Sequence, residues 1–143
     1  MIRSLVLATA LFVGACTRIE PDALPNVKLG MAPGDVRDRF EPGGQGSWQT
    51  SVGAAADDTA LEWKAKDGSA KVKDARFEFH LGMLVAIRAN TNDPAPSSEK
   101  IATTPSTVSV RRAASGGGTE VVVLARDCPT HKDEAASLAS KAK

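Results

Sequence analysis

The 143-residue sequence contains only two cysteines and two histidines, and its 18 basic and 17 acidic residues leave a net charge of +1. So few nitrogen and sulfur ligands, none at a spacing typical of zinc binding, predict no metal site. Balanced charge with scattered basic residues argues against a nucleic-acid binder. The glycine-rich stretches 43–46 and 116–118 lack the setting of a phosphate-binding loop, so no cofactor is expected.

The chain also lacks a hydrophobic run long enough to cross a membrane. Its longest apolar stretch runs from Leu5 to Val13, after a single positive charge at Arg3. That is about half of the roughly 20 residues that a transmembrane helix needs. A short apolar stretch at the N-terminus, followed at once by polar sequence, is typical of a secretory signal peptide. We therefore interpret residues 1–15 as a signal peptide.

The segment Val13-Gly14-Ala15-Cys16 resembles a lipobox, the processing signal of bacterial lipoproteins. The resemblance implies cleavage between Ala15 and Cys16 and attachment to Cys16 of a diacylglycerol and usually an N-acyl chain such as palmitate. Two or more chains hold a protein stably on a bilayer. Thr17 stands where an aspartate often signals inner-membrane retention, which implies an outer-membrane anchor facing the periplasm. The alternative is an ordinary secretory signal, with Cys16 incidental.

Cleavage after residue 15 would leave 128 residues with 17 basic and 17 acidic side chains. That length suits a single domain. Residues 16–26, which include two prolines, are expected to form the acylated cysteine and a tether, and residues 27–143 a single domain. Because lipid would occupy Cys16, Cys128 has no disulfide partner in the mature chain, so the domain is not a disulfide scaffold.

The order of sequence patterns predicts an α+β fold, with an antiparallel sheet of four to six strands, a short N-terminal helix and a C-terminal helix. The first helix is expected within 30–40, with Pro33 at its first position and Val36 and Phe40 on one face. Alternating patterns predict strands from Ser47 onward, near 61–65, 75–81, 83–90, 107–112 and 119–126.

The remaining segments are assigned from local signals. The connection 91–105 is expected to contain one helical turn at 97–102, and the C-terminal helix is expected within 130–143, with Thr130 and Asp133 as a capping box. The apolar run 121–124 suggests an interior strand. Asp57 and Asp58 are expected on solvated surface, and His80 on the outward face of a strand.

The hairpin around Gly82 allows two registers. A two-residue loop would place Arg88 on the core face, whereas a three-residue loop over 81–83 keeps apolar residues together, so we predict the second. This register places Arg76 opposite Arg88 on the outer face, and Glu78 is expected to offset part of the repulsion between these like charges. The predicted pairs are Phe79 with Val85, Phe77 with Ile87, and Ala75 with Ala89.

Two segments resemble the SmpA/OmlA-like lipoproteins and their β-lactamase-inhibitor-like fold. They are Gly30-Met31 with Asp35-Val36 and Phe40, and the hairpin Phe77-x-Phe79-x-Leu81-Gly82-Met83-Leu84-Val85-x-Ile87. The resemblance covers about residues 28–90 and implies a small, non-enzymatic, outer-membrane-anchored module; the best-known member of the family assists β-barrel assembly. The chain departs from the family in having Ala32 in place of Ser or Thr, and residues after 90 have no counterpart. No partner is carried over.

Three side chains are candidates for function. Trp48 lies in a glycine-rich region and either packs in the core or is exposed as a partner contact, since Trp is common at interface hot spots. Cys128 and His131 lie at the expected start of the last helix, where the helix dipole would favour a reactive thiolate. The alternative is that Cys128 is a small buried residue at a strand-to-helix corner and His131 a solvated first-turn residue.

The sequence therefore predicts that the protein is not an enzyme. The leading expectation is a membrane-anchored, periplasm-facing module that contacts envelope proteins through its sheet face or glycine-rich loops. Two alternatives remain: a thiol-dependent enzyme or redox protein using Cys128, and a small-ligand carrier with a cavity between the sheet and the terminal helix.

Overall fold

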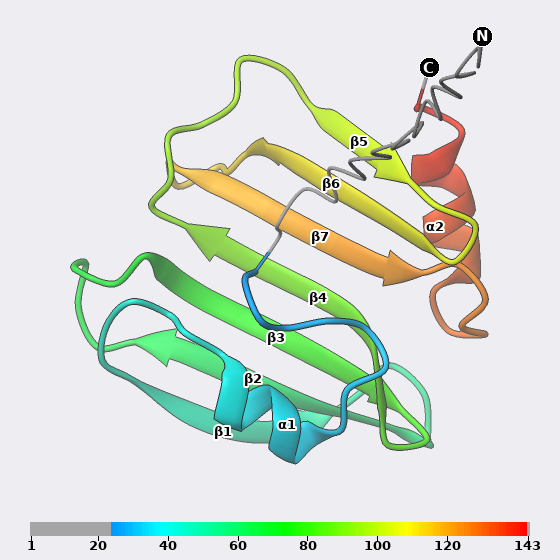
Figure 1. Ribbon diagram of the computed structural model, residues 1–143, viewed down its shortest axis with the longest axis horizontal. Helices are drawn as coiled ribbons and strands as arrows, with labels where there is room; N and C mark the ends of the chain where they lie inside the picture. Colours follow the sequence, from blue (N-terminus) through cyan, green and yellow to red (C-terminus); the bar gives the residue numbers. More distant parts are fainter. Residues whose placement is uncertain (1–23, 143) are drawn as a thin grey trace, which may run out of the picture.

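The computed structural model describes residues 24–142, so the predicted signal peptide, the lipidation site Cys16 and most of the predicted tether lie outside the described residues. Seven strands form one antiparallel sheet in the order β1-β2-β3-β4-β7-β6-β5 (Figure 1). The strands are β1 (Gly46–Val52), β2 (Asp58–Ala65), β3 (Val72–His80), β4 (Met83–Thr91), β5 (Lys100–Thr103), β6 (Thr107–Ala113) and β7 (Thr119–Ala125). The predicted α+β class is confirmed, but the sheet has seven strands, not four to six.

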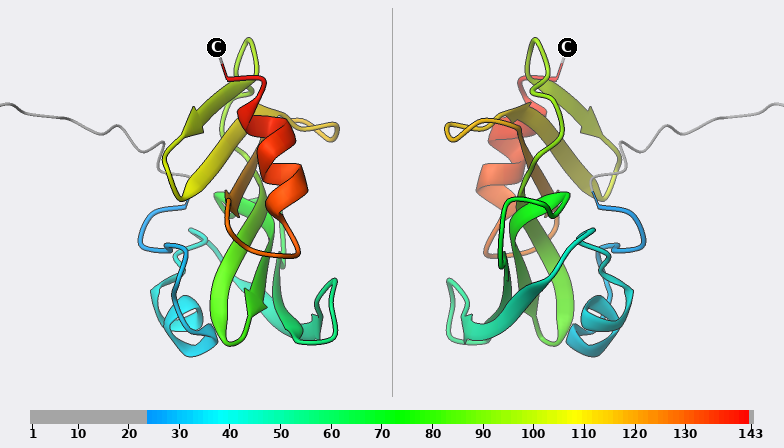
Figure 2. Two further views of the ribbon diagram at one scale, coloured as in Figure 1. Left: turned by 90° about the vertical axis from the view of Figure 1, so that its right-hand side faces the viewer. Right: turned by 90° about the vertical axis from the view of Figure 1, so that its left-hand side faces the viewer.

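Two short helices lie on opposite faces of this sheet (Figure 2). Helix α1 (Pro33–Arg39) covers one face over β1 to β4, and helix α2 (Lys132–Ala139) packs on the other face against β5, β6 and β7. Each helix therefore covers about half of the sheet, on opposite sides. No helix within residues 24–142 is long and apolar enough to cross a membrane.

The larger core lies under α1. Val36 and Phe40 project from one face of α1, four residues apart as predicted, and meet the alternate residues of β2 and β3 that point toward them. The Phe40 ring makes an edge contact with Phe77, with 5.1 Å between ring centroids. Burying each such side chain contributes about 1.5–3 kcal/mol. Leu24 is also buried in this core, which therefore extends back at least to that residue.

The smaller core lies under α2. Ala135 and Leu138 of α2 contact the side chains that β6 and β7 direct to the same face, namely Val108, Val110, Val122 and Leu124. Strand β7 lies between β4 and β6, and Val121 on its other face is fully buried. The prediction of an interior strand at 121–124 is confirmed, because a strand buried on both faces needs apolar residues at consecutive positions.

The β3–β4 hairpin combines features of both registers considered from the sequence. Its loop has two residues, Leu81 and Gly82, both with positive φ (50° and 78°), so the predicted three-residue loop is wrong. The additional residue is Val85, which forms a bulge in β4. Beyond the bulge the predicted register holds, with Phe77 opposite Ile87 and Ala75 opposite Ala89, whereas Phe79 lies opposite Leu84 and not Val85.

Two local predictions in the second half of the chain are wrong. The segment expected to contain a helical turn at 97–102 instead leads into strand β5, where Ile101 packs against the core under α2. Helix α2 has no capping box: His131 is its N-cap residue and makes no side-chain cap. The Thr130 hydroxyl, expected to cap the helix, donates a hydrogen bond to Asp58. In both places a tertiary contact outweighs the local signal.

Candidate functional site

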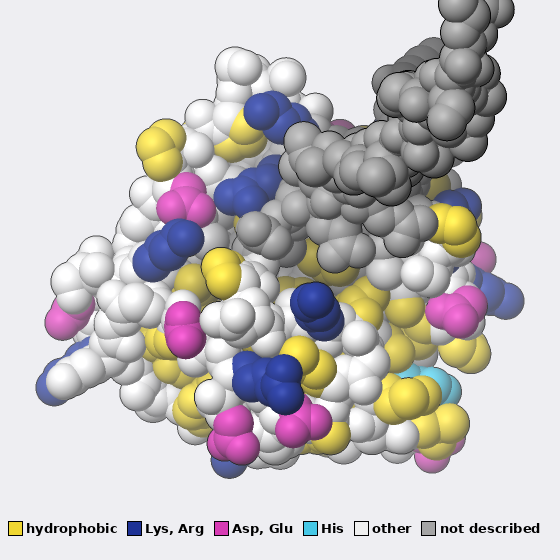
Figure 3. Space-filling model, in the orientation of Figure 1, with side chains coloured by type: hydrophobic (Ala, Val, Ile, Leu, Met, Phe, Trp, Pro, Cys, Tyr) yellow, Lys and Arg dark blue, Asp and Glu magenta, His cyan; other side chains and the backbone are white. Residues whose placement is uncertain are grey.

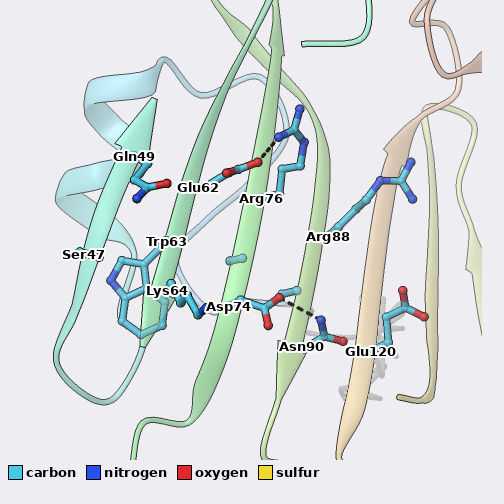
Figure 4. A pocket seen from close by; sticks show the side chains of 12 residues that line it. Ser47, Gln49, Glu62, Trp63, Lys64, Asp74, Arg76, Arg88, Asn90 and Glu120 are labelled. Carbon is cyan, nitrogen blue, oxygen red and sulfur yellow. Dashed lines mark hydrogen bonds and ion pairs between the residues drawn. The ribbon is translucent and has the colours of Figure 1, made fainter. Parts of the chain in front are cut away.

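Among residues 24–142, no helix covers the face of β1 to β3 opposite α1, because α2 packs mainly against β5 to β7 and meets β4 only at Ala86 and Arg88. Polar side chains, together with Trp63, Ala75 and Ala89, line a shallow groove on this face with a volume of about 280 Å³ (Figure 4). We call this surface the open sheet face, and define it by Ser47, Gln49, Glu62, Lys64, Asp74, Arg76, Arg88, Asn90 and Glu120.

The strand register places these side chains in two rows that run across the sheet. Gln49, Glu62, Arg76 and Arg88 are successive partners across β1, β2, β3 and β4 and form one row. Ser47, Lys64, Asp74, Asn90 and Glu120 are successive partners across β1 to β4 and β7 and form the other. Side chains alternate between faces along a strand, so these residues point away from the core under α1.

Arg76 is held at the centre of the first row by four neighbours, one of which is the Val52 carbonyl oxygen, which accepts a hydrogen bond from Arg76 Nη2 at 3.1 Å. Arg76 also pairs with Glu62, as Figure 4 shows, its Nε donates to Glu78 Oε1 at 2.9 Å, and its Nη1 donates to Ser51 Oγ at 3.1 Å. The hydrogen bond to Glu78 is the main reason why the pKa of Arg76 lies above its usual value. The like-charge contact with Arg88 predicted from the sequence is therefore offset, by Glu78 as expected and also by Glu62.

Arg88 connects the open sheet face to α2. Its guanidinium donates to both carboxylate oxygens of Glu134, at 3.0 and 2.7 Å, and these bonds lower the pKa of the Glu134 carboxyl. Bidentate pairs of this kind fix geometry as well as charge. In contrast, no carboxylate in residues 24–142 lies within 4 Å of the Lys64 ammonium group. Lys64 and Gln49 are exposed and are available for contact.

A buried polar cluster lies at the end of the sheet where β2 begins and β3 ends. Asp58 is only 4% exposed, so its predicted place on solvated surface is wrong. Its carboxylate bonds to His80 Nδ1 at 2.6 Å and accepts the Thr130 hydroxyl at 2.9 Å. Burial alone would raise the pKa of Asp58, but the bonds to His80 and Thr130 outweigh it and the net pKa is below the usual value.

His131 also belongs to this region. It is buried, so the alternative that it is a solvated first-turn residue is wrong. Its Nε2 lies 2.9 Å from Glu78 Oε2, close enough for an ion pair, although the angles are not those of a hydrogen bond and neither atom has a different partner within residues 24–142. The segment that leads into α2 is therefore attached to β2 through Thr130 and to β3 through His131. These contacts fix where α2 begins.

The cluster has a carboxylate and an imidazole in the arrangement that orients a general base. General-base catalysis also needs a nucleophile or substrate within hydrogen-bond reach of the imidazole. Among the described residues, His80 contacts Asp58, and no hydroxyl or thiol is bonded to its other ring nitrogen. Nor does any group of three or more His, Cys, Asp or Glu side chains in residues 24–142 have the arrangement of a metal site.

Cys128 is buried and packs against Val85 and Ala125, at the corner between β7 and α2. No hydrogen bond joins its thiol to His131 in the described part of the chain, because the imidazole is directed to Glu78. The structure therefore does not bring these two residues together as a thiol–imidazole pair. The space between the sheet and α2, where a ligand carrier would need its cavity, is filled by the smaller core.

Trp48 lies on the α1 side of β1 and is partly buried. Its ring makes an edge contact with Phe40, with centroids 5.5 Å apart, and the Arg37 guanidinium lies 5.9 Å from the ring centroid. On this side of the molecule, charged side chains of both signs are interspersed with apolar ones (Figure 3). Among residues 24–142, the large apolar residues that are well exposed are Val52, Leu81 and Met83.

The sequence interpretation did not identify the open sheet face as a set of residues. The signal was present: polar side chains occupy alternate positions in four successive strands, on the face opposite the apolar ones. Reading this signal requires the order and register of the strands, which alternation alone does not supply.

The fold and this face define an α+β domain with one antiparallel sheet, half of which has a solvated, ion-paired surface. No protein-family model, curated protein or solved structure matches the chain. The resemblance to the SmpA/OmlA-like lipoproteins stays a prediction.

Proposed function

We propose that this protein is a membrane-anchored, non-catalytic interaction module of the bacterial envelope, which contacts envelope proteins through the open sheet face. The observation that carries the proposal is the pair of polar rows at the fixed spacing of paired strands, on a part of the sheet that neither helix covers. Polar and charged groups at fixed spacing favour recognition of a complementary surface, since little side-chain entropy is lost when held groups bind.

The charges on this face support protein recognition over binding of a simple anion. Arg76 and Arg88 already have carboxylate partners, and the rows contain acidic groups beside the basic ones. A partner surface with both signs of charge would match this pattern. A phosphate or sulfate would instead be repelled by the carboxylates that lie beside the basic groups. The exposed Lys64 and Gln49, near the β1 edge, would make the first contacts with such a partner.

Attachment to the outer membrane, facing the periplasm, is the second part of the proposal and depends on the lipobox-like segment ending at Cys16. Replacing Cys16 with Ser removes the acylated thiol. We expect the Cys16→Ser protein to move from the membrane fraction to the soluble periplasmic fraction, with an unchanged circular dichroism spectrum. Continued membrane attachment of this variant would contradict lipid anchoring.

Charge reversal on the open sheet face tests the interaction. With purified Cys16→Ser protein as bait and a detergent-solubilised envelope extract, we expect Lys64→Glu to reduce recovery of each specifically bound protein by roughly tenfold, equivalent to about 1.4 kcal/mol. Lys28→Glu makes the same charge change at an exposed position in the segment before α1 and should leave recovery unchanged. Equal recovery with both variants would contradict the proposed surface.

A further inference from the structure

The two edges of the sheet differ in how they are protected from pairing with another strand. Edge strand β5 has only four residues, begins with Lys100 and is soon followed by Pro105. Short length, charged residues and proline each disfavour pairing of an edge strand with a strand of another chain. Edge strand β1 has seven residues, none of them charged and none proline, and every one is exposed or only partly buried. The β1 edge therefore lacks the protection that β5 has.

The hydrogen bonds at the two ends of β1 show which backbone groups point outward. Gly53 N donates to Asp58 O at 3.0 Å, and Lys66 N donates to Gln45 O at 2.8 Å. Both pairs fit the unbroken β1–β2 register, in which bonded and non-bonded pairs alternate. Odd-numbered residues of β1 therefore bond to β2, and the N–H and C=O groups of Trp48 and Thr50 point away from it. No backbone partner for these groups lies within residues 24–142.

The side chains next to this edge add a charge preference. Arg37 of α1 lies over the Trp48 ring, and its Nη2 is 3.4 Å from Thr50 Oγ1, a long and weak hydrogen bond. No carboxylate among the described residues lies within 4 Å of this guanidinium. A strand added beside β1 would place its α1-side side chains close to Arg37, where an acidic group would form an ion pair.

We propose that the edge of β1 binds an extended segment of a partner protein, which adds to the sheet as a further strand and places an acidic side chain beside Arg37. The inference rests on the proposed function, because it names the kind of contact that the module makes. Backbone hydrogen bonds to Trp48 and Thr50 would supply affinity, and Arg37 together with the partly buried Trp48 would supply selectivity.

A second copy of this chain is a poorer occupant of the same edge. In an antiparallel pair of two β1 strands related by a two-fold axis, both copies of α1 would lie on the same face of the joined sheet. The two Arg37 guanidinium groups, each next to Thr50 of its own strand, would then approach one another. Like charges at such a position disfavour the pairing, whereas an acidic partner segment removes the repulsion.

The test selects binders from a phage-displayed library of random seven-residue peptides, using the Cys16→Ser chain as bait. We expect peptides with an acidic residue to be enriched, and their synthetic forms to bind about tenfold more weakly to Thr50→Pro and to Arg37→Glu. Proline at position 50 removes an outward N–H and leaves the bonds to β2 in place. Lys132→Glu makes the same charge change as Arg37→Glu at an exposed position of α2, on the opposite side of the sheet; it is the control and should bind as the original chain does.

Amide hydrogen exchange gives a readout that does not depend on the folding of any variant. On addition of the selected peptide, the amides of Trp48 and Thr50 should exchange at least about tenfold more slowly, while those of Gln49 and Ser51, already bonded to β2, change less. Absence of enriched peptides, or peptides that bind Thr50→Pro equally well, would overturn the inference. So would a concentration-dependent dimer that Thr50→Pro abolishes, since the edge would then belong to a second copy.

The failure of this inference can be distinguished from failure of the proposed function. If no peptide binds the β1 edge but Lys64→Glu still reduces recovery of envelope proteins about tenfold, the open sheet face is the contact surface and the strand-addition inference is wrong. If peptides bind while Lys64→Glu has no effect, the edge is a binding site and the proposed role of the open face is wrong.

Discussion

The Thr130 hydroxyl donates a hydrogen bond to Asp58 Oδ2 at 2.9 Å, across 72 positions of sequence. This bond joins the segment before α2 to the first residue of β2. Asp58 also bonds to His80, and His131 contacts Glu78 in the same region. Together these contacts set the position of α2 over β5 to β7. The β1 to β4 half of the same sheet face, opposite α1, is thereby left as the open sheet face.

Acid should weaken the contribution of Asp58 to stability. Its folded-state pKa is below the usual value of about 3.9, so the unfolded chain binds the proton more tightly. The stabilisation is therefore complete above about pH 4 and is lost as the pH falls toward the folded-state pKa. Chemical denaturation at a series of pH values should show a shallower loss below pH 4 for Asp58→Asn than for the original chain.

The neighbouring carboxylate provides a matched control for that experiment. Asp57 is exposed and no hydrogen bond or ion pair to its side chain occurs within residues 24–142, so Asp57→Asn should follow the original chain at every pH. At pH 7, Asp58→Asn should lower the free energy of unfolding by roughly 1–2 kcal/mol, because it weakens buried hydrogen bonds. Identical acid profiles for the two variants would contradict the assigned role of Asp58.

Replacing His131 with Ala should destabilise the fold, because Glu78 Oε2 would lose the imidazole nitrogen that lies 2.9 Å from it in a buried site. The expected loss is about 1–3 kcal/mol in the free energy of unfolding. Lys132 is the next residue and is exposed, so Lys132→Ala should change the free energy by less than about 0.5 kcal/mol. Urea denaturation measures both, and an equal effect of the two variants would contradict the buried pair.

Leu81 should be replaceable by Asn with a gain in stability. It has φ of 50° and is 71% exposed, in a two-residue loop where both positions need positive φ. Asn adopts this conformation more easily than Leu, so Leu81→Asn should raise the free energy of unfolding by roughly 1 kcal/mol. Leu81→Ala keeps the strain while removing the apolar side chain and should not stabilise. A less stable Asn variant would indicate that Leu81 makes a contact that favours it.

The thiol of Cys128 should react slowly in the native protein. In the Cys16→Ser chain it is the sole thiol, and it is 4% exposed. Labelling then requires local opening, so the rate at neutral pH should be on the order of 100-fold or more below that of a free model thiol. Addition of denaturant should restore the model rate. A native rate at or above the model value would favour the alternative of a thiol-dependent enzyme or redox protein.

The parts of the fold that depend on local pattern could be predicted from the sequence. Pro33, Val36 and Phe40 indicate α1 because helix periodicity places the last two on one face, and the apolar run 121–124 indicates an interior strand. The pairing of Phe77 with Ile87 follows from keeping apolar residues on one face. The position of the additional residue in this hairpin was predicted wrongly. A three-residue loop and a bulge at Val85 both keep the apolar residues on one face, so the pattern does not distinguish them.

The buried polar cluster could not be predicted, because its members are far apart in the sequence. Asp58 and His131 each look like surface residues in their own segments, and only the β2–β3 pairing and the path of the chain after β7 bring their neighbours together. The open sheet face depends in the same way on the order of the strands. Tertiary contacts decide both, and local propensity does not report them.

Contact between the open sheet face and envelope proteins in the cell is the central feature of the proposed function. A photo-reactive amino acid placed at Lys64 or Gln49 in the otherwise unchanged, Cys16-containing protein tests this directly, with Lys28 as the exposed control position before α1. After irradiation of intact cells, we predict that the same envelope proteins are cross-linked from Lys64 and Gln49 and not from Lys28. Reproducible absence of envelope-derived adducts from both open-face positions, or an identical set from Lys28, would contradict contact through the open sheet face.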